Sequence, residues 1–132
     1  MSNKLVDICV NLMDKVFFEK ENVVIEEAKK NNVFKMVLVG NDLDSSKKAV
    51  AMAEEFNFIS TAGYHPHNAK EWTKDSYKSL LKITKSNYVK AIGECGLDFK
   101  RNFSPPETQN KILRTKLNSS EFRYFRTAEG KL

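Results

Sequence analysis

The chain is poor in the residues that mark several classes of protein. Its two cysteines, Cys9 and Cys95, are too few for a disulfide scaffold, so we read them as reduced thiols in a cytoplasmic protein. Five glycines and three prolines in 132 residues exclude collagen-like and linker-like chains. No apolar run approaches the roughly 20 residues of a membrane span, and the first residues make a poor signal peptide. One soluble globular domain, with no membrane partner, is therefore expected.

The net charge of +5 is concentrated near the C-terminus. Residues 107–132 hold six basic and three acidic side chains, whereas the preceding part is close to neutral. Two interpretations stay open, an anionic partner or a solvated basic tail.

Four short apolar runs predict strands. They are rich in Val, Ile and Phe and nearly continuous in apolarity, which is typical of parallel strands covered on both faces. The runs are Leu5–Val10, Lys35–Gly40, Phe58–Gly63 and Tyr88–Gly93.

Helical segments separate these runs. Asp44 or Ser45 is a candidate N-cap for the second helix, and Ser104 and Glu107 read as a capping box for the fourth. The alternation of strands and helices predicts an α/β fold with a parallel sheet, either a doubly wound sheet or part of a (β/α)8 barrel. The expected helices are residues 22–32, 45–56, 75–85 and the segment from 104 onward.

Residues that could carry chemistry follow the strands. In parallel α/β folds, ligands bind at the carboxyl ends of the strands. Asn11 follows the first run, His65 and His67 follow the third, and Glu94 and Asp98 follow the fourth. Histidine and carboxylate on one rim suit a divalent metal or acid–base chemistry.

Each of these signals also has a structural interpretation. A His-x-His loop is often structural, and Asp98 could cap a turn. Cys95 could be a nucleophile, although a small buried cysteine is commoner. Trp72 could stack on a base, or it could pack on the third helix. Asp7 lies inside an apolar strand, and a buried carboxylate needs a partner.

Three segments of the sequence together resemble one known family. They are LVDICVNL (5–12), TAGYHPHNAKEW (61–72) and AIGECGLDFKRNFSPPETQ (91–109). In that order they resemble the opening strand, the second motif and the signature of the TatD-type metal-dependent deoxyribonucleases. The resemblance implies a TIM-barrel-type hydrolase that cleaves phosphodiester bonds of DNA, of the 3′–5′ exonuclease type acting on single strands or 3′ ends, with a divalent metal. Mg²⁺ is the first expectation, with Mn²⁺ or Zn²⁺ as alternatives.

The resemblance also implies site residues. Glu94 corresponds to a metal ligand and His65 to an active-site histidine. The expected substrate-binding residues are Asn11, His67, Lys100 and Arg101. Many relatives carry a ligating His-x-His where this chain has Cys9 and Asn11, a departure shared with TatD proper.

The chain also departs from the family in extent. Residues 1–118 fit the N-terminal (β/α)4 half of a TIM-barrel-type metal-dependent hydrolase, whereas 119–132 form a basic, divergent tail that we expect to be disordered. No histidine follows His67, so the family's later metal ligands are missing. We therefore expect a truncated form that holds metal weakly and is inactive alone. The alternative is a non-catalytic half barrel that self-associates through exposed sheet edges or binds a partner.

Overall fold

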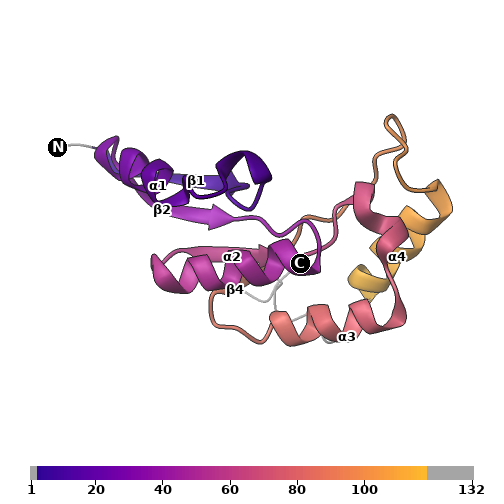
Figure 1. Ribbon diagram of the computed structural model, residues 1–132. Helices are drawn as coiled ribbons and strands as arrows, with labels where there is room; N and C mark the ends of the chain where they lie inside the picture. The colour runs from indigo at the N-terminus through magenta and orange to yellow at the C-terminus, as the bar shows by residue number, and fades with distance from the viewer. Residues whose placement is uncertain (1–2, 119–132) are drawn as a thin grey trace.

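A computed structural model describes residues 3–118. Four parallel strands form one sheet in the order β1-β2-β3-β4 (Figure 1). None of the helices in this part of the chain has the length and apolar character needed to cross a bilayer. The elements are β1 (Leu5–Val10), η1 (Lys15–Phe17), α1 (Glu21–Lys30), β2 (Val33–Leu38), α2 (Leu43–Glu55), β3 (Ile59–Ala62), η2 (Pro66–Glu71), α3 (Lys74–Ile83), β4 (Val89–Ile92) and α4 (Pro106–Asn118).

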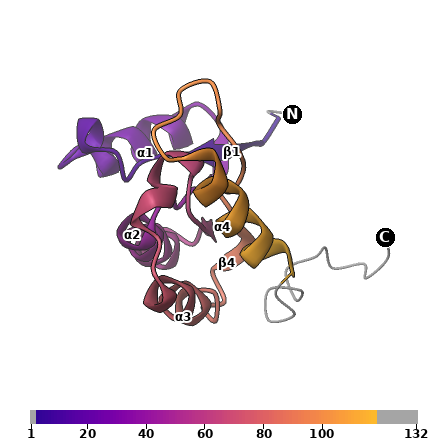
Figure 2. The ribbon, with the colours of Figure 1, turned by 90° about the vertical axis from the view of Figure 1, so that its right-hand side faces the viewer.

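The sheet and its first three helices form two layers. Ile25 of α1 and Ala49 and Ala53 of α2 pack with Leu38 of β2 in one fully buried cluster. A second cluster joins Leu80 of α3 to β3 and β4. Viewed from the right-hand side of Figure 1, α1, α2 and α3 follow one another around the sheet (Figure 2). This is the predicted α/β arrangement of a partial parallel barrel.

Strand β1 is the exception to the predicted burial. Its first five residues are exposed, and Ile8 keeps 73% of its surface accessible. The expectation of cover on both faces is therefore wrong for this strand, although it holds better for β2 and β3. The physical reason is that β1, paired only with β2 among the described strands, contributes no residue before Val10 to a core cluster.

Two predicted helix starts are corrected by the structure. The N-cap of α2 is Asp42, whose side chain accepts a hydrogen bond from the amide of Ser45 at 2.7 Å. Helix α4 begins at Pro106, and the hydroxyl of Ser104 bonds to η2 instead of capping α4. The predicted tail, 119–132, lies outside the described residues.

Candidate active-site rim

The carboxyl ends of β3 and β4 meet at a glycine contact. A Cβ built on Gly63 would lie 2.3 Å from the carbonyl carbon of Gly93, so only glycine fits there. The amide of Gly93 donates to the carbonyl of Ala62 at 3.0 Å, and the amide of Glu94 donates to the carbonyl of Gly40 at 2.9 Å. The close approach of the two backbones therefore sets where the following residues emerge.

His65 and Glu94 emerge side by side at this rim. His65 Nε2 lies 3.5 Å from Glu94 Oε1. His65 Nδ1 accepts a hydrogen bond from the amide of His67 at 3.1 Å, so the proton of the neutral imidazole belongs on Nε2 and faces Glu94. Burial lowers the pKa of His65 below its ordinary value, an effect that the Glu94 carboxylate partly offsets. His65 is therefore a neutral N–H donor near pH 7.

A second pair lies beside the first. His67 Nε2 and Asp98 Oδ2 are 2.6 Å apart, and Arg101 Nη1 donates to the same carboxylate oxygen at 3.2 Å. The hydrogen bond from His67, followed by that from the Arg101 amide, holds the pKa of Asp98 well below its usual range. Asp98 is thus a fixed carboxylate that orients both a histidine and an arginine.

Two buried polar side chains hold the β4–α4 loop in place: Ser104 ties it to η2, and Gln109 ties it to α4. The hydroxyl of Ser104 donates to the carbonyl of His67 at 2.7 Å and accepts from the amide of Lys70 at 3.0 Å. Gln109, only 1% exposed, accepts from the amide of Asp98 at 2.8 Å and donates to the carbonyl of Ser104. Because buried polar groups are satisfied in this way, the loop has a defined path beside the histidines.

The remaining predicted residues lie nearby but apart from the His65–Glu94 pair. Asn11 lines a neighbouring hollow of about 280 Å³ together with Asn41 and Asn68. The carbonyl of Asn41 accepts from the amide of His65, so this hollow adjoins the rim. Lys100 and Arg101 are exposed on the β4–α4 loop.

A divalent metal needs more ligands than this rim offers. Within residues 3–118, no three His, Cys, Asp or Glu side chains cluster as a metal site. Among the described residues, the Glu94 carboxylate has one side-chain partner, Nε2 of His65, and a carboxylate with so little support holds Mg²⁺ loosely. The described residues therefore do not make a complete metal centre.

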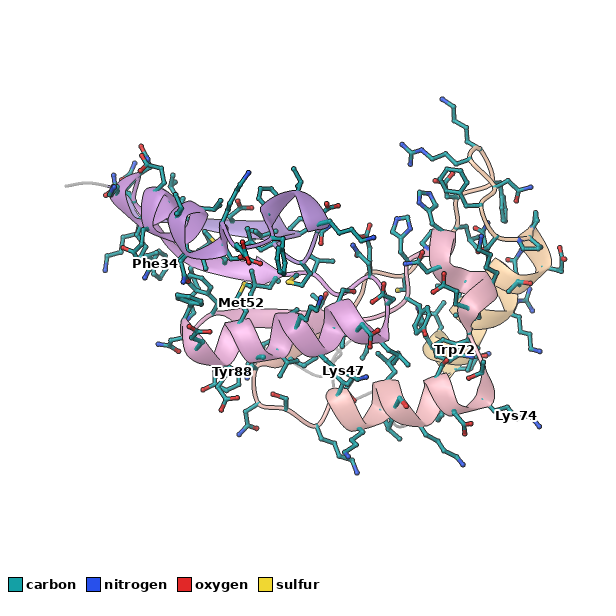
Figure 3. The ribbon with its side chains drawn as sticks, viewed as in Figure 1. Phe34, Lys47, Met52, Trp72, Lys74 and Tyr88 are labelled. Atoms are coloured by element: carbon teal, nitrogen blue, oxygen red, sulfur yellow. The ribbon has the colours of Figure 1, made fainter. Side chains whose placement is uncertain are left out.

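Several sequence interpretations can now be compared with the geometry. Trp72 packs in the cluster around Leu80 of α3, where its indole also meets Tyr64, and Figure 3 shows it where η2 and α4 approach α3. Asp7 is exposed, so the argument from a buried carboxylate fails, and Cys95 is only half-buried.

Sequence reasoning also missed the two loop anchors and one buried cation. The sequence predicts Ser104 as a helix cap and predicts no role for Gln109. The amino group of Lys116 is buried and donates to the carbonyl of Tyr64 at 2.8 Å. A glutamine in the first turn of a helix, or a lysine nearly three turns in, gives no sequence signal of such a contact, because the contact depends on how the helix docks.

A partial parallel barrel with histidine and carboxylate at its C-terminal rim defines the class of TIM-barrel-type proteins, whose active sites lie at that rim. The family described as TatD related DNase matches residues 6–121. The chain is similar to the 3′-5′ ssDNA/RNA exonuclease TatD of Erwinia amylovora, with 41% identity over 105 residues, which cover 78% of this chain and 40% of that relative. The corresponding exonuclease of Salmonella typhimurium is 37% identical over 112 residues, covering 84% and 43%.

Solved structures agree with this similarity. A hydrolase TatD family protein from Entamoeba histolytica superposes with a TM-score of 0.79 at 30% identity, covering 87% of this chain and 45% of the other. An uncharacterized amidohydrolase from Saccharomyces cerevisiae, at 18% identity and a TM-score of 0.78, shares the fold. The chain belongs to the TatD family, and it spans about two fifths of the length of the curated relatives it matches. The predicted resemblance and the partial-barrel fold are both confirmed.

Proposed function

We propose that the chain supplies the N-terminal part of the active site of a hydrolase that cleaves DNA phosphodiester bonds in the 3′–5′ direction. The observation that carries this proposal is the His65–Glu94 pair, 3.5 Å apart at the carboxyl ends of two neighbouring strands. The family is metal-dependent, and the similar relatives are single-strand exonucleases. A cytoplasmic location remains our expectation for such an activity.

Each rim residue has a proposed role. Glu94 is one ligand of a divalent cation, Mg²⁺ in the first instance and Mn²⁺ or Zn²⁺ as alternatives, and the other ligands come from outside residues 3–118. His65 donates its Nε2 proton to a water molecule or a phosphate oxygen. Lys100 and Arg101 bind phosphate, and Arg101 is oriented for this by Asp98.

Further contacts with the substrate are proposed at the edges of the rim. His67 is held by Asp98, and Asn11 lines the adjoining hollow. Both are suited to hydrogen bonds with sugar or phosphate oxygens. Neither is needed for the chemistry of the His65–Glu94 pair.

The 132-residue chain by itself should not catalyse this reaction. Pure protein incubated with Mg²⁺, Mn²⁺ or Zn²⁺ and a labelled single strand should leave the strand intact, because Glu94 alone holds Mg²⁺ loosely and catalytic Zn²⁺ usually has three protein ligands. Hydrolysis that depends on Glu94 would overturn this part of the proposal.

A chimaera tests the contribution of the rim directly. Residues 5–118 replace the matching segment of the Erwinia amylovora exonuclease, which restores the rest of the barrel. The chimaera should degrade a single strand from its 3′ end, and Glu94→Gln should lower the rate by about 100-fold or more, the scale of a lost electrostatic contact to the transition state. Lys74→Ala, on α3, is the control. A folded but inactive chimaera would contradict the proposed function.

Self-association is a second candidate function, favoured by the exposure of β1. Leu5, Val6 and Ile8 are 52%, 48% and 73% exposed on a strand at the edge of the sheet. Apolar edge strands favour pairing with another chain. Analytical ultracentrifugation should show a metal-independent dimer that Ile8→Lys converts to monomer, whereas a wild-type monomer at high concentration would refute it.

A further inference from the structure

The β4–α4 loop, residues 93–105, combines exposed rings with basic side chains. Phe99 and Phe103 are 51% and 59% exposed, and Lys100 and Arg101 lie between them in the sequence. In Figures 1 and 2 the orange loop stands away from the body of the molecule. Two exposed phenylalanine rings on one short loop make an apolar patch, and such a patch rimmed by polar side chains is typical of an interaction site.

The loop is held in shape before any partner arrives. Asp98 Oδ1 accepts from the amide of Arg101 at 3.1 Å, and the amide of Asn102 donates to the carbonyl of Asp98 at 3.3 Å. Asn102 adopts φ 51°, a conformation that asparagine tolerates. The side-chain oxygen of Gln109 accepts a hydrogen bond from the amide of Asp98 and so anchors the turn to α4. A partner would therefore meet a largely pre-organised surface and lose less affinity to ordering.

The exposed rings adjoin the proposed reaction centre. The rings of Phe103 and His67 are 4.7 Å apart in an edge-to-face contact, and those of His67 and His65 are 4.1 Å apart. His65 in turn faces Glu94. A chain of ring contacts thus leads from the loop to the His65–Glu94 pair.

We propose that this loop is a stacking platform for single-stranded nucleic acid. Phe99 and Phe103 stack on bases of the strand, while Lys100 and Arg101 hold the phosphates between them. Aromatic rings interleaved with basic side chains are the usual chemistry of sequence-tolerant single-strand binding. Duplex DNA is disfavoured because its bases are already stacked and paired. The inference rests on the proposed function, since it names the form of substrate that reaches the same site.

Binding without catalysis tests the platform. Fluorescence anisotropy, in EDTA and at low salt, would compare a labelled oligothymidylate with a strand of equal length that carries abasic sugars and the same phosphates. The wild-type chain should prefer the strand with bases. Phe103→Ala should weaken binding of that strand by about 5- to 100-fold, as expected for one lost stacked base, and should leave the abasic strand nearly unaffected.

Matched variants separate stacking from other effects. Phe34→Ala removes a ring that is 52% exposed, with the Lys4 amino group 5.6 Å above it. Figure 3 places Phe34 at the end of the molecule opposite the loop, so this variant should bind both strands as the wild type does. Phe103→Leu keeps an apolar side chain without a ring and should behave like Phe103→Ala. Circular dichroism checks that each variant is folded.

The phosphate contacts have their own readout. Replacing Lys100 and Arg101 by alanine should weaken binding of both strands to the same extent. It should also reduce the slope of log affinity against log salt concentration by about 1.4, or about 0.7 for each phosphate contact. Lys74→Ala, which removes one exposed charge from α3, should not change that slope.

Several results would overturn the platform. The proposal fails if Phe103→Ala weakens binding of the abasic strand as much as binding of the strand with bases. It also fails if Phe103→Leu binds like the wild type, or if Phe34→Ala weakens binding as much as Phe103→Ala does. The exposed rings would then form a contact surface for another protein. The outcome is independent of hydrolysis, since an inactive chimaera with intact base-dependent binding would refute the proposed function and leave the platform in place.

Discussion

The β3–β4 rim and strand β1 show how differently two parts of one sheet can be supported. At the rim, backbone contact at Gly63 and hydrogen bonds from Ser104 and Gln109 fix the backbone from which the histidines and Asp98 project. At β1, a strand with an equally apolar sequence leaves Leu5, Val6 and Ile8 exposed.

The difference lies in the neighbours, because strand propensity is similar in both regions. Strand β3 is paired on both sides, and β4, although it is paired only with β3, joins a core cluster through Val89 and Ile92. Among the described strands β1 is paired only with β2, and Val10 is its one residue packed against a core cluster. An apolar run therefore favours burial of its side chains, and the neighbouring strands and helices determine whether those side chains are buried. The rim can carry a site because its support is local, within residues 40–109.

The largest expected contrast compares a buried side chain of β2 with an exposed side chain of β1. Leu38 of β2 is fully buried, and Leu38→Ala should lower the free energy of unfolding by about 2–5 kcal/mol. Ile8→Ala should cost less than about 1 kcal/mol, since the side chain is already in contact with solvent. Urea titration followed by circular dichroism measures both.

A different result at Ile8 would break the comparison in an informative way. A cost close to that of Leu38→Ala, and one that grows with protein concentration, would mean that β1 is covered in solution by a second chain. A concentration-independent cost below about 1 kcal/mol would keep β1 as an open edge.

A glycine contact should have the next largest effect. Gly63→Ala places a Cβ 2.3 Å from backbone atoms of Gly93, so β3 and β4 must separate, at a cost of about 1–3 kcal/mol or more. Gly96→Ala is the matched control, because nothing lies within 4 Å of its Cβ. Thermal unfolding compares the two variants, and equal melting temperatures would show that the rim tolerates separation.

Much of this fold could be predicted from the sequence because the signals are local. Periodicity and apolar runs located all four strands and four helices to within a few residues, and the family resemblance supplied the barrel class. The burial of β1 could not be predicted in this way. Whether Ile8 is buried depends on which elements lie beside β1, and the sequence of Leu5–Val10 does not indicate which elements these are.

The site divides along the same line. His65, His67 and Glu94 could be chosen from the sequence because each directly follows a strand. Their partners could not, since the contacts of Asp98 with His67 and of Lys116 with Tyr64 join residues 31 and 52 positions apart. Such contacts depend on how α4 docks, which is a property of the packed chain.

The smallest expected effect is a pH dependence at the Lys116 contact, where α4 meets the loop after β3. Burial lowers the pKa of Lys116 to about 8, from 10.5 in the unfolded chain. Between these values the unfolded state binds more protons than the folded state, so the free energy of unfolding should rise with pH. From pH 8 to 9.5 the gain in the free energy of unfolding should be about 1–2 kcal/mol.

The control is Lys116→Gln, which keeps a donor for the carbonyl of Tyr64 and in which that gain should vanish. Because all other titratable groups are common to both proteins, the difference between the two stability-against-pH curves isolates Lys116. Parallel curves for wild type and Lys116→Gln across this range would show that the amino group stays solvated, and that α4 is docked more loosely on the rim than the distances imply.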